Sequence, residues 1–254
     1  MKLVLAFFCA LASLALAIGS GGAAGQGTAT PPAPPPPGAT REQVAQGRTL
    51  FLNSCSSCHG LDARGIHGRG PSLHGVGERA ADFYLSTGRM PLDDPKDQPL
   101  RHEPAFTRPK IDALVAYVGS LGGPPIPRSD PARGSISEGF RVFSDSCAGC
   151  HQVVGQGGMV TGARVPALSH ATPTEIAEAV RIGPYLMPKF SESRLDQHQL
   201  DSVAKYIAYT RAPDDAGGWA LGHVGPIPEG IVTWLLGLAA LILVIRVIGE
   251  RTPE

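Results

Sequence analysis

Two Cys-x-x-Cys-His pentapeptides constrain this chain more than any other feature. They are CSSCH at residues 55–59 and CAGCH at residues 147–151. This spacing is the pattern of covalent c-type haem attachment, in which two thiols bond to the haem and the adjacent histidine becomes an axial iron ligand. The sequence therefore predicts two covalently bound haem c groups. Their thiol attachment points would be Cys55, Cys58, Cys147 and Cys150, and their proximal iron ligands His59 and His151.

Two other uses of a Cys-x-x-Cys pair have to be weighed. One is a thioredoxin-like redox pair, and the other is half of a zinc site. A redox pair has no use for the trailing histidine, and neither pentapeptide follows a strand rich in Val and Ile. Haem attachment is therefore the favoured interpretation of both motifs.

The second face of each iron needs a ligand, and methionine is the usual one in electron-carrying cytochromes c. Met90 lies 31 residues after His59, and Met187 lies 36 residues after His151. A lone methionine more often fills a gap in a core. Here, however, both methionines precede a proline at matching places after the two motifs, so we expect them to be axial ligands. Met159 has no counterpart in the first half, and we expect it at the surface or at a haem edge.

An internal repeat accompanies the two motifs. Gly47, Phe51 and the motif residues recur 92 positions later, from Gly139 onward. The stretch IDALVAYV at residues 111–118 recurs as LDSVAKYI at 200–207, with an offset of 89. The offset changes inside loops and stays fixed inside motifs, as expected where loops tolerate insertions. The chain is thus predicted to be a duplicated helical domain of about ninety residues per copy.

Helical periodicity places three helices in each copy, while strand-like alternation is nearly absent. Thr172, Pro173 and Glu175 form the expected capping-box start of one helix. Such a small core is marginal unless it buries a large apolar group such as haem. The expected helices cover residues 41–53, 80–87 and 110–121, and then 137–146, 173–182 and 195–210.

Both ends of the chain suggest a membrane. Residues 1–24 read as a signal peptide or an N-terminal anchor, and Cys9 would be an apolar residue within it. Residues 230–249 carry the uncharged run IVTWLLGLAALILVI and predict one transmembrane helix. Arg246 and Arg251 lie downstream of that run, so the positive-inside tendency puts the C-terminus in the cytoplasm and the haem domains on the outer face of the cell membrane.

The predicted fold class is all-α, with two tandem haem domains and one C-terminal transmembrane helix. Between the leader and the first domain, residues 25–40 are rich in Pro and Gly and read as a linker. The remaining boundaries are domain 1 at 41–124, a linker at 125–134, domain 2 at 135–213, a juxtamembrane segment at 214–229, the transmembrane helix at 230–249 and a cytoplasmic tail at 250–254.

The segments after the two motifs resemble class I cytochromes c. GPSL at residues 70–73 and VPAL at 165–168 are similar to the family's proline-containing segment. In that family the proline carbonyl accepts a hydrogen bond from the proximal histidine. The resemblance implies that Pro71 would orient His59 and that Pro166 would orient His151, which fixes the tautomer and the ring angle.

A narrower resemblance covers the chain from about residue 41 to its C-terminus. GPSLHGVGERAADFYLSTGRMP, LMPKFS and GGWALGHVGPIPEG, followed by an apolar tail, resemble the dihaem cytochrome c subunit of actinobacterial-type cytochrome bcc complexes. That family is part of a quinol–cytochrome c reductase. The resemblance implies a cytochrome b subunit, a Rieske iron–sulfur subunit and a terminal cytochrome oxidase as partners.

The predicted function is electron transfer, because two six-coordinate haems leave no open position for a substrate. The chain would serve as the electron-transfer subunit of the reductase, with no catalytic site of its own. Alternatives are a dihaem peroxidase-like enzyme, the cytochrome subunit of a membrane dehydrogenase, or a freestanding dihaem carrier. Basic and acidic residues balance at 22 each, and no basic stripe interleaved with aromatic residues indicates nucleic-acid binding.

Overall fold

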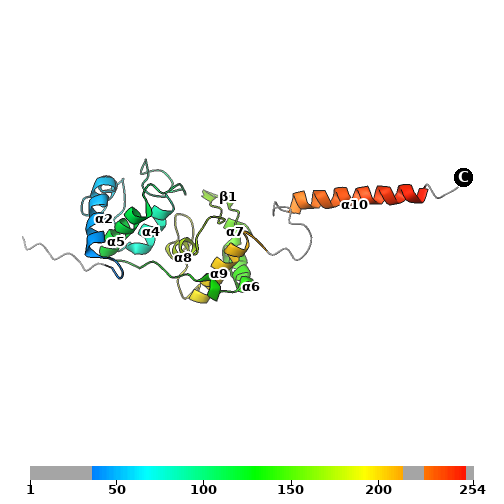
Figure 1. The fold of residues 1–254 in the computed structure, drawn as a ribbon. Coiled ribbons are helices and arrows are strands. Elements are labelled where there is room, and N and C mark those ends of the chain that lie inside the picture. The colour runs from blue at the N-terminus through cyan, green and yellow to red at the C-terminus, as the bar shows by residue number, and fades with distance from the viewer. Residues whose placement is uncertain (1–35, 214–225, 250–254) are drawn as a thin grey trace, which may run out of the picture.

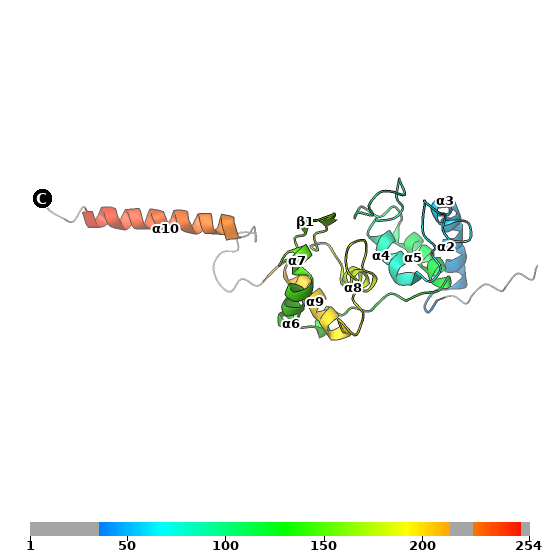
Figure 2. The ribbon, with the colours of Figure 1, turned by 180° about the vertical axis from the view of Figure 1, so that it is seen from behind.

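The computed structural model describes residues 36–213 and 226–249. Two small helical domains follow one another along the chain, and a long single helix stands apart from both (Figure 1). The reverse view gives the same order of elements (Figure 2). The expected leader at 1–24 with Cys9, the start of the following linker, residues 214–225 and the tail at 250–254 lie outside the described residues.

The two domains have the same order of helices. Domain 1 contains α2 (Arg41–Ser54), α3 (Ser56–His59), α4 (Gly77–Ser86) and α5 (Arg108–Ser120). Domain 2 contains the 3₁₀ turn η1 (Pro131–Arg133), α6 (Ile136–Ser146), α7 (Ala148–His151), β1 (Gly158–Val160), β2 (Ala163–Val165), α8 (Pro173–Ile182) and α9 (Gln197–Tyr209).

The first and last long helices of each domain cross and form its core. In domain 1, α2 packs on α5, and the rings of Phe51 and Tyr117 lie 5.1 Å apart between centroids. In domain 2, α6 packs on α9, and the equivalent rings of Phe143 and Tyr206 lie 5.4 Å apart. The predicted repeat therefore extends to the packing of the core and is more than a likeness of motifs.

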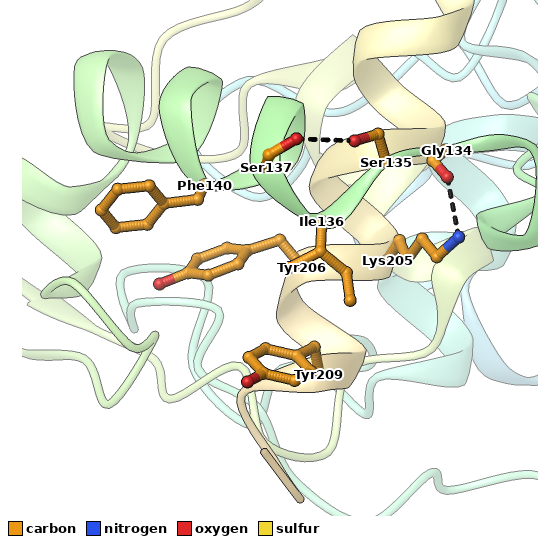
Figure 3. Close-up of a pocket in the computed structure, with 8 residues that line it drawn as sticks. All are labelled: Gly134, Ser135, Ile136, Ser137, Phe140, Lys205, Tyr206 and Tyr209. Atoms are coloured by element: carbon orange, nitrogen blue, oxygen red, sulfur yellow. Dashed lines mark hydrogen bonds between the residues drawn. The ribbon is translucent and has the colours of Figure 1, made fainter. Parts of the chain in front are cut away.

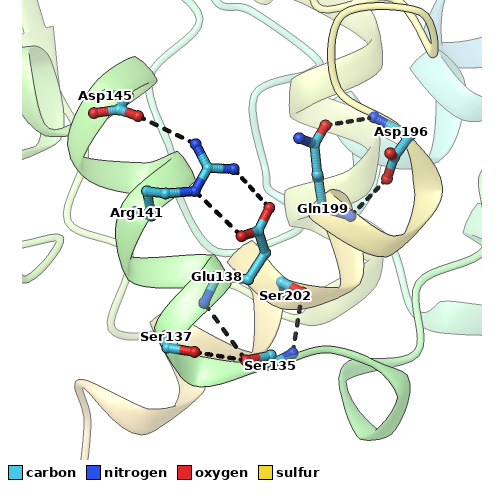
Figure 4. Close-up of polar contacts among 8 residues, drawn as sticks. All are labelled: Ser135, Ser137, Glu138, Arg141, Asp145, Asp196, Gln199 and Ser202. Carbon is cyan, nitrogen blue, oxygen red and sulfur yellow. Dashed lines mark hydrogen bonds and ion pairs between the residues drawn. The ribbon is translucent and has the colours of Figure 1, made fainter.

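Local hydrogen bonds fix where the helices of domain 2 begin. The Ser135 hydroxyl accepts from the Glu138 amide at the start of α6, and the Ser135 amide donates to the Ser202 hydroxyl of α9 at 3.0 Å (Figure 4). At the start of α9, Asp196 and Gln199 form a capping box. Such caps satisfy amides that have no partner within the helix. The two helices are therefore tied together at the point where α6 starts.

The long helices lie close to their predicted positions. The predominance of helices confirms the predicted all-α class. The segment expected at 173–182 is α8 with the same bounds, and its predicted capping box of Thr172 and Glu175 is present. The other predicted helices begin and end within about three residues of expectation. Some elements were not expected. The short helices α3 and α7 and the turn η1 were not predicted. Nor were β1 and β2, which form a short antiparallel hairpin that pairs Met159 with Arg164.

The C-terminal helix α10 (Pro226–Gly249) is a candidate membrane span. Residues 230–249 are apolar over 20 residues, and none of this stretch is buried against the rest of the protein. A helix of that length matches the hydrocarbon thickness of a bilayer. The helix begins at Pro226, four residues before the start predicted for the transmembrane segment.

Candidate haem-attachment sites

Each Cys-x-x-Cys-His motif continues directly from the first long helix of its domain. The Cys55 amide donates to the Phe51 carbonyl, and the short helix α3 then carries the chain to His59. Cys147 is bonded to Phe143 in the same way, ahead of α7. Because the motif is one helical turn, its two cysteines and its histidine lie close together beside the core.

The histidines of the two motifs are held by the backbone carbonyls of the two prolines predicted to orient them. Nδ1 of His59 lies 2.8 Å from the carbonyl oxygen of Pro71, and Nδ1 of His151 lies 3.3 Å from that of Pro166. With Nδ1 as the donor, the other ring nitrogen keeps its lone pair and can bind a metal. The pKa of His151 is lowered, because the effect of burial outweighs that of the hydrogen bond to Pro166, which acts to raise it. The neutral ring is the form that binds iron.

A glycine supports the proline segment in each domain, and sequence reasoning missed both. A Cβ atom added at Gly65 would lie 2.7 Å from the Pro71 carbonyl carbon, and one at Gly157 would lie 2.6 Å from that of Pro166. The amides of these glycines donate to the carbonyls of the two motif histidines. A signal was available, because positions 65 and 157 differ by the repeat offset of 92. Both residues have positive φ, which glycine adopts without strain.

The two predicted methionine ligands lie against the same cores as their motifs. Met90 and Cys55 are half-buried against the core of domain 1. Met187 and Cys147 are half-buried against the core of domain 2. Met159, in contrast, is 77% exposed on β1, which agrees with the expected surface position. Each domain therefore presents one imidazole, one thioether and a cysteine pair around a single apolar core.

The surroundings of the cysteines argue against a dithiol redox pair. None of the four motif cysteines forms a disulfide within the described residues. Burial, with the neighbouring motif cysteine as a second cause, raises the pKa of Cys55 and of Cys147 to about 11. A dithiol redox pair needs the opposite, a lowered pKa that supplies a thiolate. Within residues 36–213 and 226–249, there is also no grouping of three or more His, Cys, Asp or Glu that could hold a zinc ion.

The residues fit haem c at both motifs. Nδ1 of each histidine is engaged while the second ring nitrogen is left for iron, a thioether lies against the same core, and the cysteine pair sits on the adjoining helical turn. Pro71 and Pro166 are exposed at the surface, and they act through their backbone carbonyls and not through their rings.

A shallow groove in domain 2 is separate from these ligands. It runs between α6 and α9 and is lined by Ile136, Phe140, Tyr206 and Tyr209 among others (Figure 3). The ammonium group of Lys205, also at the groove, donates to the Gly134 carbonyl at 2.8 Å. None of the residues that line the groove is a predicted haem ligand, so the groove is not part of either haem-attachment site.

Family models match both domains. Residues 44–122 match the model of cytochrome c, and residues 134–207 match that of the cbb3-type cytochrome c oxidase subunit III. Each match contains one pentapeptide together with its proline segment and its methionine. The two domains are therefore cytochrome c domains, and this type of domain binds haem c covalently.

Curated relatives match most of the chain. It is 35% identical over 228 residues to the cytochrome bc1 complex cytochrome c subunit of Corynebacterium efficiens, covering 82% of this chain and 77% of the relative. It is 38% identical over 216 residues to the subunit of the same name in Mycobacterium tuberculosis H37Rv, covering 81% and 77%. A third relative, the cbb3-type cytochrome c oxidase subunit CcoP of Azospirillum sp., is 30% identical over 188 residues, covering 65% and 61%.

Proposed function

Because this chain belongs to the family of cytochrome bc1 complex cytochrome c subunits, we propose that it carries two covalent haem c groups and passes electrons from a Rieske iron–sulfur subunit to a terminal oxidase. In this role it is the electron-transfer subunit of a quinol–cytochrome c reductase and has no substrate site of its own. Its other partner is a cytochrome b subunit.

One arrangement, present twice, carries the proposal. In each domain the motif histidine donates a hydrogen bond from Nδ1 to a proline carbonyl. A half-buried methionine lies against the same core. We assign His59 with Met90, and His151 with Met187, as the axial pairs. Two filled axial positions leave no face for a substrate molecule, which favours electron transfer over catalysis at the iron.

The protein residues set the properties of the bound group. Haem iron supplies a one-electron couple, and methionine ligation raises its potential. Pro71 and Pro166 hold the imidazole rings at a fixed angle, and the hydrogen bond increases the basicity of the nitrogen that faces the metal. The apolar core beside each motif would form one wall of the haem site, and such apolar surroundings tune the potential of a bound haem.

The helix α10 would anchor the chain in the cell membrane, with residues 230–249 as the span. Arg246 and Arg251 lie on the C-terminal side of the uncharged run 231–245. By the positive-inside tendency, this favours a cytoplasmic C-terminus and haem domains on the outer face. An anchor of this kind confines the haems near their partners and raises their effective concentration over that of a free carrier.

The test is the composition of the complex. The full chain, purified from its native membrane in mild detergent, should bring down a cytochrome b and a Rieske subunit. Added quinol should then reduce its haems, and an inhibitor of quinol oxidation should block that reduction. Intact mass spectrometry should find two haem groups on the chain. Recovery of the chain with two haems but without either partner subunit would contradict the assignment to this complex.

A second candidate role is that of a cytochrome subunit within a cbb3-type oxidase. The match of residues 134–207 to subunit III and the likeness to the Azospirillum protein favour it. The same purification separates the two roles, because an oxidase subunit would copurify with the catalytic oxidase subunit and would stay oxidised when quinol is added without a reductase.

A further inference from the structure

The two cytochrome domains contact each other through α4 and α8. At the edge of this contact, the guanidinium of Arg101 forms two bonds with the Glu175 carboxylate, at 3.0 and 3.2 Å. Nearby, the Gln98 side-chain amide donates to the Tyr185 hydroxyl at 2.9 Å. We call this contact between α4 and α8, with its flanking side chains, the interdomain dock.

Two carboxyl groups, one from each helix, are buried within the interdomain dock. Glu178 of α8 is 0% exposed, and Asp82 of α4 is 4% exposed. Asp82 lies close enough to Glu178 to share a hydrogen bond with it once one of the two carboxyl groups is protonated. Asp82 is balanced by the guanidinium of Arg108, which lies 2.8 Å from its Oδ1 and reaches it from α5. Two ionised carboxylates cannot bond to each other, so this contact requires a proton on one of them.

The surroundings place that proton on Glu178. Within the described part of the chain, neither carboxyl oxygen of Glu178 accepts a bond from an amide, a hydroxyl or a guanidinium. Arg181, on the same helix, donates from Nη1 to the carbonyls of Phe190 and Leu195, at 3.2 and 2.8 Å. Nη2 of Arg181 and Nε of Arg79 are buried and bond to no described residue, so neither atom is bonded to the Glu178 carboxyl group. Burial, followed by the charge and hydrogen bond of Asp82, raises the pKa of Glu178 to about 9. Asp82 has Arg108 to stabilise its charge, whereas Glu178 has no such direct partner.

We propose that the interdomain dock holds the two cytochrome domains together through one proton, which Glu178 carries and donates to Asp82. Glu178 is then a positioning residue for electron transfer between the haems, since the dock sets how the two domains are placed. This role rests on the proposed function, because it presumes a haem in each domain.

The dock should weaken as the pH rises. With the domains apart, Glu178 would be solvated and its pKa would return toward 4.5, its ordinary value. Between that value and about 9, the docked state holds one proton more than the separated state. The docking equilibrium constant therefore falls about tenfold per pH unit across this window. The other charged groups around Glu178 are Asp82, Glu175, Arg79, Arg108 and Arg181, and the arginines keep their charge throughout.

The test measures the distance between the domains in the haem-loaded full chain, reconstituted in nanodiscs. Gadolinium spin labels at Ala45→Cys and Ala208→Cys report on it, since both residues are exposed on helices outside the dock. We expect one narrow distance distribution at pH 6, and a second, broad population that grows toward pH 8.5. Glu178→Gln keeps a donor for Asp82 and cannot ionise, so its distribution should stay narrow at both pH values. Glu192→Gln, an exposed matched control, should follow the native protein.

If the native dock is too stable to open by pH 8.5, a third variant that weakens it still allows the test. Arg101→Gln removes the edge ion pair and should move the broadening to lower pH without removing its pH dependence. The proposal is overturned if the native protein and Arg101→Gln both keep one distribution from pH 6 to 8.5, or if Glu178→Gln broadens with pH as the native protein does. Haem staining of the same samples is a separate check: chains without covalent haem would contradict the proposed function, whatever the distances show.

Discussion

Gly139 meets Ser202 where α6 crosses α9, and the two backbones touch there. A Cβ atom at Gly139 would lie 2.0 Å from the Ser202 carbonyl oxygen. The equivalent contact in domain 1 joins Gly47 to the Ala113 carbonyl oxygen, where the same added atom would lie 1.8 Å away. In both domains, therefore, the crossing of the first and last helices requires a residue without a side chain.

Gly139→Ala should destabilise the protein, because the added methyl group can be accommodated only if α6 and α9 move apart. Overpacking of this kind costs about 1–3 kcal/mol, and a clash with backbone places it at the upper end. Guanidinium unfolding of the haem-loaded protein measures the loss. Gly230→Ala on α10 is the control, because nothing lies within 4 Å of a Cβ at that position and it is outside both haem motifs. Equal stability of the two variants would contradict the close crossing.

This crossing illustrates what the sequence could predict. Gly47 and Gly139 recur at the repeat offset of 92, together with the pentapeptides and Phe51 and Phe143. A residue that must recur for steric or chemical reasons leaves such a signal. The amphipathic helices were predictable for a related reason, since one stripe of each must face the core.

Other features of the structure could not be predicted from the sequence, or only weakly. Gln152 occupies the place of Gly60 after the motif and takes a positive φ of 64°, which residue type alone does not predict. The hairpin of β1 and β2 is reduced in domain 1 to one antiparallel bridge, between Ile66 and Gly70. The interdomain dock was also missed, because Asp82 and Glu178 belong to different copies and come together only through the packing of α4 on α8.

Met187→Ala should leave haem attached to domain 2 but remove its thioether ligand. The expected result is a loss of about half of the methionine–iron absorption, on a two-haem count, and a lower potential for the affected haem. Optical spectra of the oxidised protein and a redox titration measure both. Met159→Leu is the control, because Met159 is exposed on β1. An unchanged spectrum for Met187→Ala would refute Met187 as a ligand, and the same comparison applies to Met90→Ala.

Cys147→Ser should cripple covalent attachment in domain 2 only. One thioether bond is lost there, while Cys55 and Cys58 remain intact in domain 1. Haem staining of the denatured protein should fall to about half, on a two-haem count. Ser146→Ala, next to the motif and exposed, should stain like the native protein. Full staining of Cys147→Ser would mean that this thiol does not anchor the group.

Arg108→Gln should destabilise the protein because Asp82 would lose the cation that balances its buried carboxylate. Removing one partner of a fully buried pair costs about 3–5 kcal/mol. The side chain of Arg108 is 55% exposed, so solvent screening reduces the expected loss to about 1–3 kcal/mol. Lys110→Gln, an exposed change on the same helix, should have little effect on the free energy of unfolding.

A double-mutant cycle with Asp82→Asn separates the ion pair from the general loss of charge. The double variant should be more stable than the sum of the two single losses predicts, because an amide at position 82 leaves no charge to compensate. Asparagine also keeps a group that can bond to Glu178. Strictly additive losses in guanidinium unfolding would show that Arg108 acts on α4 by some route other than its 2.8 Å contact with Asp82.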